Sequence, residues 1–231
     1  GKLGTGGQFI LRDTNNTFLT LPQSTGYLNL NRSLVLPNTT GSTIGVIYKG
    51  ADRFLHNYGT DNLFLGINSG NFTMSGLGNT AIGNSALDNN TTGIFNTSLG
   101  VQSLTNNTTG DNNTSLGYQS LSGNLSGDNN VAIGHLTLSS NNSGLSNTGV
   151  GFRSLNANTT GDNNVAIGNN SGATITTGSN NIAIGNAANV SSGTSSNQIR
   201  LGNTAITYAG IQVAWTVTSD RRLKSNILNS N

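Results

Sequence analysis

A glycine recurs every 17 residues along most of this 231-residue chain. Most of these glycines close a short phrase such as NTAIG, NTSLG or NVAIG, so a whole segment repeats. The nine glycines are Gly66, Gly83, Gly100, Gly117, Gly134, Gly151, Gly168, Gly185 and Gly202. A fixed period of this length is typical of a solenoid, in which each repeat forms one turn of a coil. A solenoid is an extended object, so the pattern favours a fibre or a binding rod over an enzyme.

The composition fits such a coil better than a globular domain. Only 8% of the residues are charged, whereas globular domains carry about a quarter. Disordered segments share this bias, but the aliphatic residues of this chain keep a fixed register, which disorder does not require. The net charge of +2 comes without a basic stripe along the repeats, so we expect no nucleic-acid binding. No apolar run is long enough to cross a membrane, so we expect no membrane insertion either.

Each repeat contains a five-residue phrase that alternates like a β-strand. Counted from four residues before the glycine, position 1 is nearly always Asn, position 3 is mostly small, position 4 is always aliphatic and position 5 is the glycine. Positions 2 and 4 share one face of such a strand, and position 3 lies on the other. Stacked coils turn each position into a column with a spacing of about 4.8 Å. We expect the glycine to end the strand with a positive φ.

The second half of each repeat predicts a second strand-like segment and a second turn. Its phrases, such as GVQSLTNNTTG, hold an apolar column at Leu87, Leu104, Leu121, Leu138 and Leu155. A second glycine column starts at Gly76, and an asparagine column starts at Asn90. Asn side chains bond nearby backbone groups and tolerate left-handed conformations, which suits a turn. The sequence therefore predicts an all-β fold, a parallel β-solenoid whose 17-residue coils have two short strands and two turns.

Apolar or small residues lie on both faces of the predicted strand. One face fills the coil, and the other is left as an exposed stripe along nine coils. Either loops cover this stripe, or identical chains pack their stripes around a common axis. We favour a side-by-side homotrimer, because the sequence shows no segment long enough to act as a cover.

The repeats resemble the head repeats of trimeric autotransporter adhesins. The phrases that carry the resemblance are NTAIGNSAL, NNVAIGHLTL, NNVAIGNNSG and NNIAIGNAA, within Asn62 to Ala214. The resemblance implies a left-handed parallel β-roll, with three rolls side by side. Repeats of that family are commonly shorter, so the extra residues here would lengthen the NNTTG-type turn.

The end of the chain resembles the opening of the endosialidase-type intramolecular chaperone, a self-cleaving domain of phage tail spikes and tail fibres. The residues that carry this second resemblance are SDRRLKSNI. It implies that Ser219 is the reactive residue, that Lys224 is its partner and that the bond between Ser219 and Asp220 is cut. A serine hydroxyl does need such a neighbouring base. The alternative is a polar linker, and only Asp220 to Asn231 follow the cut, so this segment is a truncated start of that domain.

Three regions follow from these patterns. Residues 1–61 form a β-rich connector, 62–214 the nine-coil β-roll, and 215–231 a cap or linker with the start of the chaperone. In the connector, Arg53, His56 and Tyr58 make the best cluster for chemistry, although we expect them to form a packing junction. Near the other end, Tyr208 and Trp215 are expected to plug the rod.

The leading functional hypothesis is a fibre or adhesin segment on the surface of a virion or a bacterial cell. The candidate contacts for a host-surface glycan or protein receptor are Tyr118, His135, Phe152 and Arg153, from a variable column of the repeat. Neutral variation explains this column equally well. We expect no cofactor, no metal and no enzymatic activity beyond a single self-cleavage of a full-length parent. The alternatives are an ice-binding or a glycan-binding solenoid.

Overall fold

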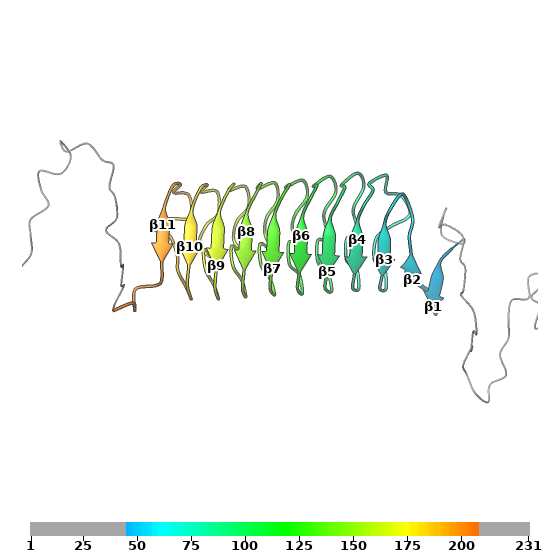
Figure 1. Cartoon of the computed structure of the whole chain (residues 1–231), viewed down its shortest axis with the longest axis horizontal. Helices are drawn as coiled ribbons and strands as arrows, with labels where there is room; N and C mark the ends of the chain where they lie inside the picture. Colours follow the sequence, from blue (N-terminus) through cyan, green and yellow to red (C-terminus); the bar gives the residue numbers. More distant parts are fainter. Residues whose placement is uncertain (1–44, 208–231) are drawn as a thin grey trace, which may run out of the picture. The chain divides into compact units, whose positions relative to one another are not determined.

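The structure, a computed structural model, describes residues 45–207. Within this range the chain contains strands and turns and no helix, and eleven strands form one sheet in chain order. The antiparallel pair β1 (Ile47–Lys49) and β2 (Asp52–His56) comes first, and β2 pairs antiparallel with β3 (Leu63–Leu65). The described part of the expected connector therefore continues the sheet of the first coil (Figure 1).

From β3 onward all strands are parallel, with one strand in each repeat. They are β4 (Thr80–Ile82), β5 (Thr97–Leu99), β6 (Thr114–Leu116), β7 (Val131–Ile133), β8 (Thr148–Val150), β9 (Val165–Ile167), β10 (Ile182–Ile184) and β11 (Ile199–Leu201). Facing residues in neighbouring strands lie 17 positions apart, as Ala132 and Gly149 do. The parallel solenoid with 17-residue coils is thus confirmed. We call each strand from β3 to β11 a rung.

The repeating glycine ends each rung because no other residue fits there. Gly117 has a φ of +139°, a conformation that residues with a Cβ rarely adopt. A Cβ on Gly117 would also lie 2.5 Å from the carbonyl oxygen of Gly134 in the next coil. The expected positive φ is confirmed, and the close approach of neighbouring coils adds a second reason for the glycine.

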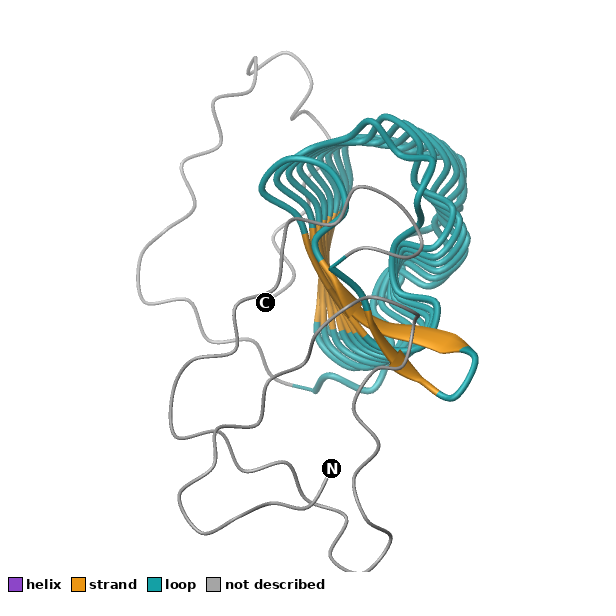
Figure 2. Cartoon of the chain, turned by 90° about the vertical axis from the view of Figure 1, so that its right-hand side faces the viewer, coloured by secondary structure: helices purple, strands orange, loops and turns teal. Residues whose placement is uncertain are grey.

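The second half of the coil differs from the prediction, because it contains no second strand. It runs as a series of turns, which close the coil opposite the single wall of strands (Figure 2). In the coil of β6, three residues of this series have positive φ: Gln119 at +52°, Leu121 at +50° and Asn129 at +58°. The periodic leucine resembled a strand residue in the sequence, but its left-handed backbone reverses the chain direction instead.

The predicted leucine column does form the core. Leu87, Leu104, Leu121, Leu138 and Leu155 are all fully buried. A left-handed leucine costs about 1–2 kcal/mol, and burial of its side chain returns about 1.5–3 kcal/mol. Where glycine replaces this leucine, another side chain supplies the volume: Phe64 packs on Gly70, and Ile175 lies near Gly172.

Two buried asparagine columns join the coils to one another. In the first column, at position 1, the Asn130 side chain donates to the carbonyl of Gly144 at 2.9 Å and accepts from the Asn147 backbone N–H at 2.9 Å. In the second column, each amide from Asn107 to Asn158 donates to the asparagine one coil before, as Asn124 does to Asn107 at 2.7 Å. Buried amides need such partners, and here the partners are the closing turn of the same coil and the neighbouring coils.

Candidate functional site

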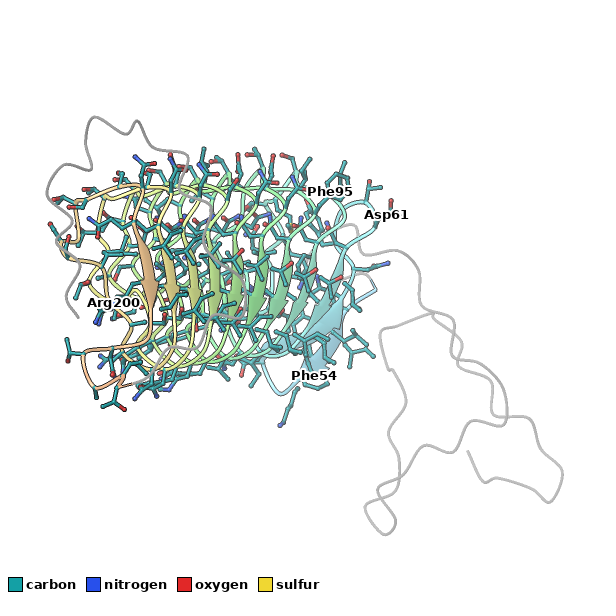
Figure 3. The ribbon with its side chains drawn as sticks, turned by 60° about the vertical axis from the view of Figure 1, so that its left-hand side comes forward. Phe54, Asp61, Phe95 and Arg200 are labelled. Carbon is teal, nitrogen blue, oxygen red and sulfur yellow. The ribbon has the colours of Figure 1, made fainter. Side chains whose placement is uncertain are left out.

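The outer surface of the rungs consists of positions 2 and 4, and none of these 18 residues is charged. Position 4 is aliphatic in all nine rungs, whereas position 2 is aliphatic in five rungs and threonine in four, and we call this surface the apolar face. Position 4 is the more prominent column, where Leu99, Leu116, Ile133, Ile167 and Ile184 keep between 37% and 44% of their surface exposed. Position 4 therefore forms a continuous aliphatic stripe along one wall of the solenoid. Side chains all around the stack recur from coil to coil (Figure 3).

The inner surface of the rungs holds position 3, and this settles which strand face is exposed. Ala132 and Ala166 are fully buried, and Ser98 and Ser115 are buried and hydrogen-bonded inside the coil. The leucine column already fills the interior, so only a small side chain fits opposite it. No loop within residues 62–207 covers positions 2 and 4, because position 4 stays exposed or half-buried in every rung.

The candidate receptor contacts lie together at position 6, one residue after the repeating glycine. The rings of Tyr118 and His135 stack edge to face with centroids 5.2 Å apart, and those of His135 and Phe152 do so at 5.3 Å. We call Tyr118, His135 and Phe152 the aromatic ladder. All three are exposed, and the Arg153 guanidinium lies 5.7 Å from the Phe152 ring centroid. The structure thus brings all four residues into one patch.

The aromatic ladder borders the apolar face directly. Position 4 of the same coil precedes it by two residues, and the glycine between them has no side chain. Val101, one coil before Tyr118 in the same column, is also exposed. The stripe and the ladder therefore form one surface, aliphatic along the whole stack and aromatic only around β6 to β8.

The residues named for self-cleavage, Ser219, Asp220 and Lys224, lie outside the described residues, as do Tyr208 and Trp215. Their roles stay predictions. The described chain ends just after β11, whose residues Ile199 and Leu201 are among the most exposed aliphatic side chains of the stack.

The cluster of Arg53, His56 and Tyr58 is built as a packing junction at the start of the stack. The His56 ring is buried, and it lies 4.8 Å from the Phe64 ring and 4.7 Å from the Phe72 ring. Its Nε2–H donates to the Ser69 carbonyl at 2.9 Å. Burial lowers the pKa of His56, because the charged ring would lose its hydration in this apolar cluster.

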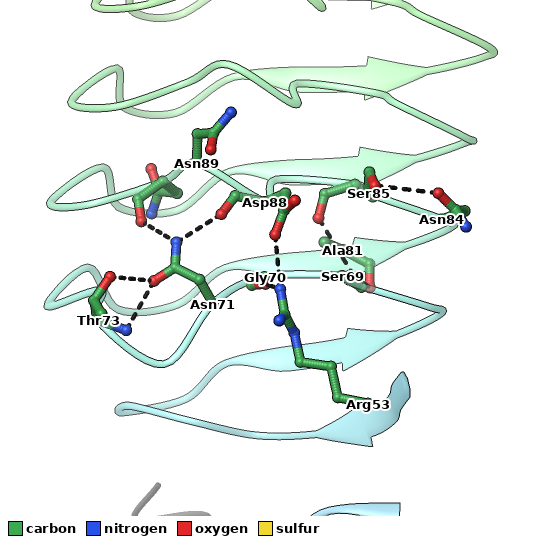
Figure 4. A network of polar contacts seen from close by, with 12 residues as sticks. Arg53, Ser69, Gly70, Asn71, Thr73, Ala81, Asn84, Ser85, Asp88 and Asn89 are labelled. Atoms are coloured by element: carbon green, nitrogen blue, oxygen red, sulfur yellow. Dashed lines mark hydrogen bonds and ion pairs between the residues drawn. The ribbon is translucent and has the colours of Figure 1, made fainter. Parts of the chain in front are cut away.

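Arg53 closes the same junction from the side. It forms an ion pair with Asp88 at 2.7 Å and also donates to the Gly70 carbonyl, so it joins β2 to the turns of the first two coils (Figure 4). Burial raises the pKa of Asp88, an effect that the neighbouring guanidinium opposes. The sequence indicated the cluster but gave no sign that Asp88 belongs to it, because the two partners are 35 residues apart.

The aspartates of the repeats support the backbone instead of forming a carboxylate pair for catalysis. Asp128 accepts from the Asp111 N–H at 2.8 Å, and Asp162 accepts from the Leu145 N–H at 2.7 Å. Between residues 45 and 207, no group of three His, Cys, Asp or Glu side chains is placed to hold a metal. In the same part of the chain, no helix is long and apolar enough to span a membrane.

The turn threonines, which an ice-binding solenoid would present to ice, form hydrogen bonds within the stack. The hydroxyl groups of Thr91 and Thr108 each donate to the carbonyl one coil further on, at 2.8 and 2.7 Å. Because the hydroxyl hydrogen of each threonine already bonds to the next coil, it is not free to donate to ice or to a sugar.

No protein-family model matches this chain, and neither a curated protein nor a solved structure matches it. The apolar face and the aromatic ladder are therefore the observations on which a function can be argued.

Proposed function

We propose that this chain is a segment of a trimeric fibre, on a phage or viral tail or on a bacterial surface, that acts as a rigid extracellular rod. The observation that carries the proposal is the uncharged apolar face, which runs along all nine rungs. Extended apolar patches on a soluble surface mark sites of association. The resemblance to adhesin heads supports the same arrangement.

The partner that best fits this face is another copy of the same chain. A side chain on the face is followed by an equivalent one at the strand spacing of about 4.8 Å, and a second copy has the same spacing over the same length. Side-by-side copies bury one patch against another without bringing charges together. A closed ring of three copies would leave no open apolar edge for further growth.

The rigid-rod role rests on how densely the coils are joined. Backbone strand pairing and the two asparagine columns connect neighbouring coils, and Asp111, Asp128 and Asp162 add further bonds of this kind. Contacts between neighbouring coils are what stabilises a solenoid. A rod of this kind holds its surface at a fixed distance from its base, which is what a fibre segment requires.

Charge on the apolar face tests the proposal. The double variant Leu116→Lys/Ile133→Lys places two cations on adjacent rungs, and we expect it to shift the mass in sedimentation from trimer to monomer. The matched control is Ser126→Lys/Ser143→Lys, which adds the same charge on exposed turns of the same two coils and should stay trimeric. A monomeric control, or a trimeric face variant, would remove the basis for the proposal.

Maturation by self-cleavage is the second part of the proposal and rests on the resemblance alone. In a parent chain that carries the complete chaperone, the Ser219 hydroxyl, assisted by Lys224, would promote cleavage of the bond to Asp220. Mass spectrometry of the released fibre should find its last residue to be Ser219. A Ser219→Ala parent should stay uncut, and cleavage of that variant at the same bond would rule the assignment out.

A further inference from the structure

We infer that the aromatic ladder of Tyr118, His135 and Phe152 is a contact with a neighbouring copy that fixes the axial register of the rods. The inference rests on the proposed side-by-side trimer. It assigns the ladder to the assembly and not to a receptor.

The aliphatic column at position 4 alone cannot define a register, because every rung presents one such residue with the same spacing. Position 2 changes only between threonine and an aliphatic residue, and this difference is small beside that between a ring and an asparagine. Two copies displaced by one rung would lose only the contact at the two ends and would keep the other eight rungs paired. Regular, repetitive strand surfaces are prone to such slippage.

The ladder breaks this regularity at one level of the stack. Rings occupy position 6 only in the coils of β6, β7 and β8, while the same column holds Ile67, Val101 or an asparagine in the other coils. Only the glycine at position 5 separates the ladder from position 4 of the apolar face along the chain. Copies in register place three rings at the same level on each chain, whereas copies displaced by one rung bring the end rings against Val101 and Asn169.

The geometry of the rings favours a protein neighbour over a sugar. The rings are inclined by 63° and 61° to one another, so they do not form one flat platform for stacking. The Arg153 side chain also lies over the Phe152 ring. Such a ridge of tilted rings suits interdigitation with side chains that have the same spacing, and a second copy provides these.

Spin labels on the outer turns test the register. The chain has no cysteine, so Thr109→Cys, Ser143→Cys and Thr177→Cys each give a single label on an exposed turn of the coils of β5, β7 and β9. For parallel copies in register, pulsed dipolar spectroscopy on the full chain should give one narrow distance, the same at all three sites. A short distance at Ser143→Cys only would mean antiparallel copies paired around the coil of β7, and would overturn the inference.

The ladder variant is Tyr118→Asn/His135→Asn/Phe152→Asn, which uses the residue that the column holds elsewhere. We expect its mass to stay trimeric while its label distances broaden by offsets in steps of about 4.8 Å. The matched control, Asn84→Ser/Asn169→Ser/Asn186→Ser, alters the same column outside the ladder and should keep the narrow distance.

The outcomes separate this inference from the proposed function. A ladder variant that stays trimeric with a narrow distance overturns the register role and leaves the trimer standing. A ladder variant that becomes monomeric shows that the rings drive association instead of setting register, which also overturns it. If the unsubstituted chain is monomeric, that result contradicts the proposed function itself. Retained register with loss of binding to immobilised cell-surface glycans would assign the ladder to a receptor.

Discussion

Asn130 illustrates how single side chains hold this solenoid together. Its amide is fully buried, donates to the closing turn of its own coil and accepts from the first backbone N–H of the next coil. Aspartate has the same shape but lacks the donor and would bring an unpaired charge into the coil. Asn129, next to it in the chain, is exposed and has a φ of +58°, which Asp also tolerates.

We therefore expect Asn130→Asp to lower the free energy of unfolding by about 3 kcal/mol or more, because it buries a charge and removes the amide donor to the Gly144 carbonyl. Urea unfolding followed by circular dichroism measures this. Asn129→Asp adds the same charge one residue away and should change the stability by less than about 0.5 kcal/mol. Equal effects of the two variants would contradict the bonding role of the asparagine column.

Two leucines of the same coil should contribute very differently to the stability of the fold. Leu121 is fully buried in the core, whereas Leu125 is 42% exposed on the turn. Leu121→Ala should cost about 2–5 kcal/mol, as large-to-small changes in a core do. Leu125→Ala should cost less than about 1 kcal/mol. Chemical denaturation of both variants checks the difference, and a small effect at Leu121 would mean that the coil interior collapses around the missing side chain.

The residues of the core were predictable from the sequence only in part. The leucine column and the repeating glycine were evident from their period, but positions 3 and 4 both carry residues that suit a narrow interior. Closure of the coil decides between them, because the leucine enters from the opposite side and leaves room only for Ala132 or a residue of similar size. The same limit on volume explains why the large side chain of Phe64 lies opposite Gly70, which takes the place of the core leucine in the first coil.

At the scale of the element, the junction around β2 protects the first coil. His56 packs between two phenylalanine rings, and the Arg53–Asp88 ion pair closes its side. Burial lowers the pKa of His56 from its usual value of 6.5, so the unfolded chain binds a proton at this ring more readily than the folded chain does. The stability that the neutral ring contributes is present above about pH 6.5 and is lost as the pH falls toward the folded-state pKa.

Thermal unfolding at pH 7.5 and pH 5.5 tests this linkage. The melting temperature of the chain should fall on acidification, and His56→Gln, which keeps an N–H donor but does not titrate, should reduce that fall. Since Asp88 has a raised pKa, its protonation at lower pH acts in the opposite direction. The other histidine, His135, lies outside the junction, so His135→Asn supplies the matched control. A reversed pattern between the two variants would contradict the junction's role.

The second half of the coil shows where sequence patterns mislead at this scale. The recurring leucine between small and polar residues predicted a short strand. Instead, Gln102 and Leu104 both have positive φ, and the chain turns in this segment. Periodicity reports that a side chain is buried repeatedly, but it does not report the backbone conformation that buries it.

At the scale of the whole molecule, we expect the apolar face to be buried between identical chains. Its position-4 column is exposed in the single chain, the face carries no charge and its rungs are equally spaced.

Light scattering on the purified, unmodified chain at several dilutions tests this claim most directly. Three chains of 23.7 kDa give about 71 kDa, and we predict that this mass persists as the protein is diluted, because the apolar face stays buried. A constant mass of 23.7 kDa would mean that the stripe is stable in contact with water. That result would contradict the fibre proposal and the register inference together.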